Sequence, residues 1–265
     1  MSTHLVSEQS KNELVDKAIS LAVAGKGTGG PPHEQVAELV RAYYRHVAAE
    51  DLADRSDADV YGAFAAHYRL AGNRPQGTAN VEVMTPTLAE HGWAANGHSV
   101  VEVVVDDMPF LVDSLTMELS RQLRDVHVVI HPNFDVVRDI TGVLQSVRPV
   151  PDGSLEPEGE AVRESWMHVE IDRLPEGEDL RAVVDDIQRV LRDVREAVED
   201  WRKMHAEVAA VVADLREDPP PLVADPTTPT CPGRRGGCRD RCRARRAGAR
   251  APRAARAGTR GSPGT

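Results

Sequence analysis

Residues 99–120 read SVVEVVVDDMPFLVDSLTMELS and pass from a valine-rich run to a run with helical spacing. Residues 99–105 are mostly β-branched, which predicts a buried strand. From Leu111 onward a leucine recurs every four residues, which predicts the buried face of a helix. Asp106 and Asp107 lie at the junction. We expect them to join the strand to the helix and to cap the helix N-terminus.

Further strand patterns flank this unit, and they fall at residues 78–85, 126–137, 143–150 and 165–172. The second and third are joined by the turn DITG and predict a hairpin, with a bend or an edge position at Pro132. In the last, apolar residues alternate with Trp166, His168 and Glu170, and we expect His168 to face solvent. The order strand, helix, strand, strand, strand, helix is close to the ferredoxin-like plan, which includes the ACT domains.

Helical patterns also precede the strands, at residues 13–22, 33–49 and 57–71. Ser56 is the expected N-cap of the third helix. The glycine-rich segment at residues 25–30 follows a helix and precedes two prolines. It therefore predicts a linker rather than a phosphate loop, which needs a strand before it. The predicted class is α+β, with a helical segment ahead of a ferredoxin-like or ACT-like domain.

A heptad pattern of apolar residues continues over residues 177–217 and ends at three prolines. At 1.5 Å per residue this helix would be on the order of 60 Å long. Because a domain of this size cannot cover such a length, part of the seam is expected to pack against a partner helix. The partner is another subunit or a missing part of the same chain, and we expect a homo-oligomer. His205 in the seam is expected to set register or lie exposed.

The composition excludes several classes of protein. Hydrophobic residues make up 41% of the chain, but no run of eighteen apolar residues exists, so no membrane-spanning helix is predicted. The polar N-terminus lacks a secretory signal, and the cytoplasm is the expected compartment. The first 225 residues hold 21 basic and 41 acidic residues, a balance that repels nucleic acid and anionic membranes.

The last forty residues, 226–265, carry eleven arginines, one acid and all three cysteines, but no large apolar residue. Such a segment cannot bury enough apolar surface to fold, so disorder is predicted over residues 219–265. The cysteine spacing fits no zinc site or disulfide framework. Two interpretations stay open: GC-rich DNA translated out of frame, which the composition favours, or an arginine-rich arm for nucleic acid.

No arrangement of residues in the sequence predicts catalysis. Nucleophile triads, zinc-protease, phosphate-loop and dinucleotide motifs are all absent. Two adjacent acids diverge on a strand, and a metal would need further oxygen ligands. His127 and His131 would lie about 13 Å apart on one strand, too far to share a metal. We expect no metal ligand and no catalytic residue in this chain.

Three blocks carry a more specific pattern: DDMPFLVDSLTMELS, VHVVIHPNFDVVRD and ESWMHVEIDRL. In this order they resemble the N-terminal region of the large bacterial NAD-specific glutamate dehydrogenases. The resemblance covers roughly residues 10–225. It implies ACT-like domains ahead of a distant catalytic domain that oxidises glutamate to 2-oxoglutarate with NAD. The catalytic motifs of that domain match nothing here, so the resemblance implies NAD for the full-length enzyme and no cofactor for this chain.

The resemblance also implies where an amino-acid effector would bind. ACT domains commonly hold their ligand beside the loop that joins the first strand to the first helix. Here that loop is Asp106, Asp107, Met108 and Pro109, with Pro109 expected in the first turn of the helix. The loop lacks the glycine that amino-acid-binding ACT loops often have. We expect a structural joint first and the edge of an effector site second.

The predicted regions are a helical segment, an ACT-like domain, the long helix and the tail, at residues 1–76, 77–176, 177–218 and 219–265. The expected function is that of a regulatory and assembly portion of a cytoplasmic glutamate dehydrogenase in amino-acid catabolism, truncated before its catalytic domain. This chain alone is expected to be inactive. A free-standing amino-acid-binding ACT-like protein is the alternative. A nucleic-acid-associated protein acting through the tail is the third hypothesis.

Overall fold

Strand β2 (Ser99–Asp106) contains the valine-rich run, and it pairs along its length with strand β6 (Val162–Ile171) inside a six-stranded sheet. The computed structural model describes residues 7–25, 30–154, 156–175, 177 and 180–217. All of β2 except its last residue is buried, because helices cover both faces of the sheet. The prediction of a buried strand at residues 99–105 is confirmed.

The sheet has the order β1-β2-β6-β4-β5, and β3 and β4 pair with successive parts of β6. The outer strands are β1 (Asn80–Met84), β3 (Val126–Ile130), β4 (Asn133–Arg138) and β5 (Leu144–Pro149). The single strand expected at residues 126–137 is interrupted at Pro132, because proline has no N–H for the ladder. The bend predicted there is confirmed, and β4 and β5 form the predicted hairpin.

The strand order is that of the ferredoxin-like plan with one exchange. In that plan the strand that comes after the second helix fills the edge beside the first strand. Here β1 fills that edge, although it precedes β2 in the chain. Every pair of neighbouring strands is antiparallel, as the plan requires.

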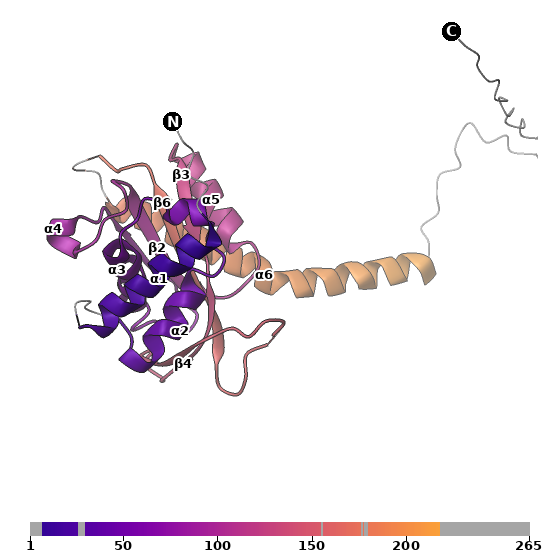
Figure 1. Ribbon diagram of the computed structural model, residues 1–265. Coiled ribbons are helices and arrows are strands. Elements are labelled where there is room, and N and C mark those ends of the chain that lie inside the picture. Colours follow the sequence, from indigo (N-terminus) through magenta and orange to yellow (C-terminus); the bar gives the residue numbers. More distant parts are fainter. Residues whose placement is uncertain (1–6, 26–29, 155, 176, 178–179, 218–265) are drawn as a thin grey trace, which may run out of the picture. The chain divides into compact units, whose positions relative to one another are not determined.

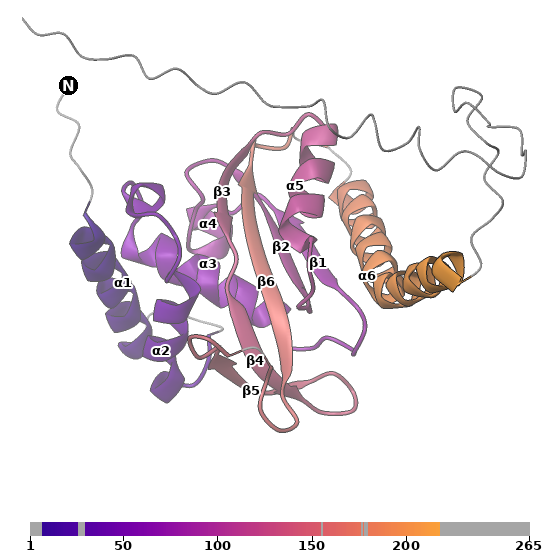
Figure 2. The ribbon, with the colours of Figure 1, turned by 90° about the vertical axis from the view of Figure 1, so that its right-hand side faces the viewer.

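Two helical layers enclose the sheet (Figures 1 and 2). Helix α5 (Leu111–Arg121) and the first half of α6 (Leu180–Glu217) cover one face, where their apolar residues pack on the valines of β2. The helices that cover the other face, or lie in its connections, are α1 (Glu8–Val23), α2 (His33–Tyr43), η1 (Ala49–Leu52), α3 (Asp57–Leu70) and α4 (Leu88–His91). Phe134 and Trp166 of the sheet pack in one apolar core with residues of α1, α2 and α3. The fold class is α+β, as predicted.

Helix α5 begins differently from the prediction. Its N-cap is Phe110, which has a φ of 72° and makes no side-chain capping bond. The expectation that Asp106 or Asp107 caps this helix, with Pro109 in the first turn, is therefore wrong. Both carboxylates are held by arginine and serine side chains instead. In contrast, Ser56 caps α3 as predicted, in a reciprocal capping box with Asp59.

Helix α2 ends at Tyr43 rather than continuing to residue 49. Lys11 of α1 gives the physical reason. Its buried ammonium group donates to the carbonyl of Val47 at 2.6 Å and to that of Arg45 at 3.2 Å. These carbonyls are satisfied outside a helix, so the chain turns away and forms η1 instead.

Three further expectations concern membrane-spanning helices, the C-terminal tail and the glycine-rich linker. None of the helices among the described residues combines the length and apolar character needed to cross a bilayer. The predicted disorder over residues 219–265 and most of the glycine-rich linker lie outside the described residues.

Substitution of Leu115 by alanine tests the packing of α5. Leu115 is 1% exposed in the core beneath α5 and α6, so Leu115→Ala is expected to lower the free energy of unfolding by about 2–5 kcal/mol. Met117, on the same helix, is 72% exposed, and Met117→Ala is expected to change it by less than about 0.5 kcal/mol. Urea unfolding of both variants measures the difference. Equal effects would contradict the packing of α5 on the sheet.

Candidate functional site

Asp106 belongs to an ion network at the end of β2. One of its carboxylate oxygens accepts a hydrogen bond from Arg195 of α6 at 2.8 Å, and the other accepts one from Arg74 at 2.5 Å. Burial by itself raises the pKa of Asp106. The hydrogen bonds and charges of the two arginines outweigh burial and hold that pKa below its usual value. Both oxygens are thus already occupied.

Glu164 of β6 is the centre of the same network. Arg74 and Arg138 both donate to its carboxylate at 2.6 Å, and the indole N–H of Trp166 donates to it at 3.1 Å. The side chain of Glu164 is fully buried, and that of Arg74 is 1% exposed. Buried charges are stable only when they are paired and hydrogen-bonded. This network therefore joins β2, β4, β6 and α6 to the turn after α3.

Asp107 points to a different neighbour. It accepts a hydrogen bond from the hydroxyl of Ser165 at 2.7 Å, and the same hydroxyl oxygen lies 3.0 Å from Nε2 of His131. Met108 packs against the apolar core beneath α5, and Pro109 is exposed. The four residues of the predicted effector loop therefore face different surroundings, and none of them lines the cavity that lies nearby.

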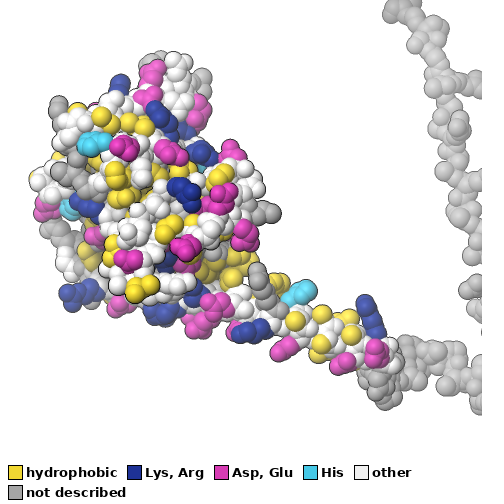
Figure 3. Space-filling model, turned by 90° about the horizontal axis from the view of Figure 1, so that it is seen from below, with side chains coloured by type: hydrophobic (Ala, Val, Ile, Leu, Met, Phe, Trp, Pro, Cys, Tyr) yellow, Lys and Arg dark blue, Asp and Glu magenta, His cyan; other side chains and the backbone are white. Residues whose placement is uncertain are grey.

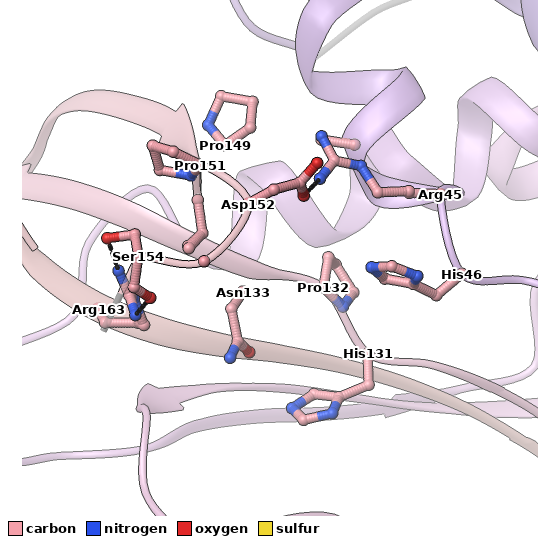
Figure 4. A pocket seen from close by; sticks show the side chains of 13 residues that line it. Arg45, His46, His131, Pro132, Asn133, Pro149, Pro151, Asp152, Ser154 and Arg163 are labelled. Atoms are coloured by element: carbon pink, nitrogen blue, oxygen red, sulfur yellow. Dashed lines mark hydrogen bonds and ion pairs between the residues drawn. The ribbon is translucent and has the colours of Figure 1, made fainter. Parts of the chain in front are cut away.

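That cavity has a volume of about 320 Å³, within the range of small-molecule pockets (Figure 4). Its walls come from the segment after α2, the break between β3 and β4, the loop after β5 and the start of β6. The polar side chains that line it are Arg45, His46, His131, Asn133, Asp152, Ser154 and Arg163. His131 links the cavity to Asp107 through the hydroxyl of Ser165.

Two guanidinium groups determine the chemistry of the cavity. Arg45 pairs with Asp152 at 2.9 Å (Figure 4). Arg163 pairs with Asp135 at 3.0 Å. Burial lowers the pKa of His131, and the charge of Asp107 only partly opposes this, so His131 is neutral near neutral pH. Arg163 is committed to Asp135 and Ser154. The cavity therefore offers a donor for a carboxylate at Arg45 and a partner for an ammonium group at Asp152.

A second group of polar residues lies inside the fold, between the sheet and helix α3. His168 is fully buried, so the expectation that it faces solvent is wrong. Its Nδ1 lies 3.2 Å from a carboxylate oxygen of Glu102, and its Nε2 lies 3.6 Å from Glu170. Alternation along β6 correctly separated two faces. The polar face is buried because the N-terminal helices cover it, which the strand pattern alone does not reveal.

A candidate metal site is formed by three buried side chains whose ligand atoms lie within 4.8 Å of one another: His67, Glu102 and His168. Both ring nitrogens of His67 already have partners, however. Nε2 donates to the carbonyl of Val103 at 3.1 Å, and Nδ1 lies 2.9 Å from the hydroxyl of Tyr43. Only two of the three side chains remain free, fewer than the three protein ligands of zinc sites. This cluster therefore does not fit a metal.

A comparison with protein families decides what the chain is related to. The family model described as "Glutamate dehydrogenase, ACT1 domain" matches residues 39–187, which is more than half of the chain. The chain belongs to this family. The ACT1 match begins inside α2 and ends inside α6, so it includes the sheet, the loop after β2 and the cavity.

Similar proteins agree with the ACT1 assignment. The chain is 35% identical over 189 residues to the NAD-specific glutamate dehydrogenase of Halomonas elongata, and 33% identical over 182 residues to that of Pseudomonas aeruginosa. These alignments cover 71% and 68% of this chain. A Mycobacterium tuberculosis enzyme of the same name is 28% identical over 153 residues, 58% of this chain. The chain spans only 11% of the first two relatives and 9% of the third.

The role of Asp106 in the ACT1 domain is tested by removing its charge. Asp106→Asn weakens two charged hydrogen bonds and is expected to lower the free energy of unfolding by about 1–3 kcal/mol. Asp113→Asn changes an exposed acid a few residues later and is expected to change it by less than about 0.5 kcal/mol. Urea unfolding at constant pH compares them. No loss in Asp106→Asn would refute a structural role for this carboxylate.

Proposed function

We propose that this chain is the N-terminal regulatory and assembly portion of an NAD-dependent glutamate dehydrogenase. The family match supports the assignment to that enzyme, because it falls on the ACT1 domain. In the full-length enzyme, NAD would serve a catalytic domain that the match does not include. On this proposal the chain by itself neither binds NAD nor oxidises glutamate, and its contribution is to bring subunits together and to respond to a small ligand.

The exposed part of α6 is the observation that carries the assembly role. The first half of α6 is packed on the sheet through buried residues that include Ile187 and Leu191. From Trp201 onward, every described side chain of the helix is exposed. Between Trp201 and Ala210, the exposed large apolar residues of α6 are Trp201, Met204 and Val208 (Figure 3). Apolar stripes of this kind mark interaction sites, and we propose that the stripe pairs with a second copy of the chain.

A charge placed in the apolar stripe tests self-assembly. Val208 is 62% exposed, so Val208→Glu leaves the monomer intact but puts a carboxylate into the proposed seam. The expected result is loss of the oligomer in analytical ultracentrifugation. Ala206→Glu is the matched control: Ala206 is also exposed, and helical geometry puts it roughly 160° away from Val208 around the helix. This control is expected to keep the wild-type oligomeric state.

Two outcomes would contradict the assembly role. A wild-type chain that stays monomeric at every accessible concentration would show that the stripe does not self-associate. An equal loss of the oligomer in Ala206→Glu would show that added charge, rather than the apolar face, disrupts the assembly.

The cavity beside Asp107 favours the second part of the proposal, a small amino-acid effector. An α-amino acid carries a carboxylate and an ammonium group, and the cavity has partners of both kinds in Arg45 and Asp152. Asp107 of the predicted effector loop borders this site through Ser165, whereas Asp106 is committed to its arginines. The same site would serve a free-standing amino-acid-binding protein, the alternative to a dehydrogenase portion.

Calorimetric titration of the chain with glutamate tests effector binding. Arg45→Gln removes one carboxylate partner and is expected to weaken binding by about tenfold or more. Arg41→Gln is the control, because Arg41 is also a surface arginine of the α2 region paired with an aspartate, Asp16, but does not line the cavity. Absence of binding at millimolar glutamate, or equal weakening in both variants, would count against this site.

A further inference from the structure

The buried cluster around His168 is built into the centre of the sheet. Glu102 of β2 and His168 of β6 are direct partners in the antiparallel ladder, so their side chains project to the same face. Glu170 is the next residue on that face of β6 and receives a hydrogen bond from Arg55 at 2.5 Å. Arg55 lies just before α3, so the cluster reaches from two central strands to the helical layer.

The charges of this cluster need one further cation. The side chains of Glu102 and His168 are fully buried, and those of Glu170 and Arg55 are 4% and 7% exposed. Two buried carboxylates and one guanidinium leave a single negative charge. Such a charge in the interior costs several kcal/mol unless it is neutralised. A proton on one of the nearby histidines would neutralise it.

His67 is not that histidine. Its Nε2 donates to the backbone carbonyl of Val103, and its Nδ1 accepts from the hydroxyl of Tyr43, which is the pattern of a neutral ring. Burial lowers the pKa of His67 to about 4, despite the opposing charge of Glu102. His168, in contrast, has an acid beside each ring nitrogen, at 3.2 and 3.6 Å.

We propose that His168 is held as an imidazolium ion between Glu102 and Glu170, and that its proton clamps the helical layer to the sheet in a pH-dependent manner. This inference is independent of the proposed function. A neutral His168 would leave Glu102 and Glu170 uncompensated in the interior. The pairing of Glu170 with Arg55, which joins α3 to β6, would then be strained by the added negative charge.

The tyrosines and aspartates around His168 do not supply the missing charge. The titratable groups that line the same small cavity, adjoin the cluster or contact Glu170 are Tyr43, Tyr44, Asp51, Asp59 and His98. His98 lies at the partly exposed edge of the cluster, where its Nδ1 is 3.0 Å from Glu170, so it can pair with Glu170 but leaves Glu102 to His168. Burial raises the pKa of Tyr43 and Tyr44, so both stay neutral. The two aspartates add negative potential, which favours the imidazolium. The cavity itself measures about 10 Å³, room for at most one water molecule.

The direction of the pH dependence is set by the two carboxylates. Burial by itself lowers the pKa of His168, but the hydrogen bond with Glu102 and the charges of Glu102 and Glu170 outweigh it and raise the pKa to about 9. A group whose pKa is higher in the folded protein than in the unfolded chain stabilises the fold. This stabilisation is complete at pH values below the pKa of the unfolded chain, near 6.5, and is lost as pH rises to the pKa of the folded protein. Stability from His168 should therefore fall between about pH 6.5 and 9.

The test combines the wild-type chain with one conservative variant. In wild-type protein labelled with ¹⁵N, NMR of the His168 ring is expected to show both nitrogens protonated at neutral pH. Urea unfolding from pH 6 to 10 is expected to show the folding equilibrium constant falling by on the order of a hundredfold. Glu102→Gln keeps the shape but removes one carboxylate, so this fall is expected to end about one pH unit lower or more and to be smaller by about tenfold or more. Glu160→Gln, an exposed acid, is the control and should match the wild type.

Three results would overturn the proposal. The first is a neutral His168 ring in the wild type at neutral pH. The second is a Glu102→Gln profile in which stability falls over the same pH range and by the same factor as in the wild type. The third is a gain in stability when zinc is added to chelator-treated protein, with loss of that gain in Glu102→Gln, which would make a metal rather than a proton the balancing cation.

Discussion

The antiparallel pairing of β2 with β6 is the constraint on which the rest of the structure depends. Both strands are buried on both faces, so each side chain along them must match a helical layer above or below. Valines of β2 and Met167, Val169 and Ile171 of β6 meet α5 and α6. Glu102 and His168 meet the N-terminal helices. A slip of one residue would exchange these two sets, putting charges into an apolar layer, so the register is fixed by chemistry as well as by hydrogen bonds.

Charged residues connect this sheet to the elements around it at two places. Near one end of β6, Glu164 forms ion pairs with Arg74 and Arg138. Asp106 of β2 pairs with Arg195 of α6 at the same end. Near the other end, Glu170 forms an ion pair with Arg55 and lies 3.6 Å from His168. Both groups lie where the strand meets helices that come from distant parts of the sequence. Ion pairs of this kind are weak evidence of added stability, but they disfavour other arrangements of the same elements, because any other arrangement leaves a buried charge unpaired.

Local patterns predicted most of the elements, because strand and helix periods depend on neighbouring residues. Residues 99–105, the β4–β5 hairpin and the Ser56 cap are examples. The start of α5 was missed because the capping rule treats Asp106 and Asp107 as free carboxylates, whereas arginines and a serine distant in sequence hold them. The burial of His168 was missed for a related reason: a polar face predicts solvent unless another layer covers it. The cavity, which several separate segments of chain help to line, has no local signature at all.

The edge position of β1 has a consequence for α6. In the usual ferredoxin-like plan, the second helix must deliver the chain back to the sheet, so its length is set by the strand that comes after it. Here that edge is already filled by β1, which precedes β2, so the length of α6 is not constrained by a strand that must reach the same edge. Its length is therefore open to change during evolution, but its phase is not. Each inserted residue rotates the remainder of the helix by about 100° and advances it by about 1.5 Å, so insertions that keep the apolar stripe aligned come in multiples of about seven residues.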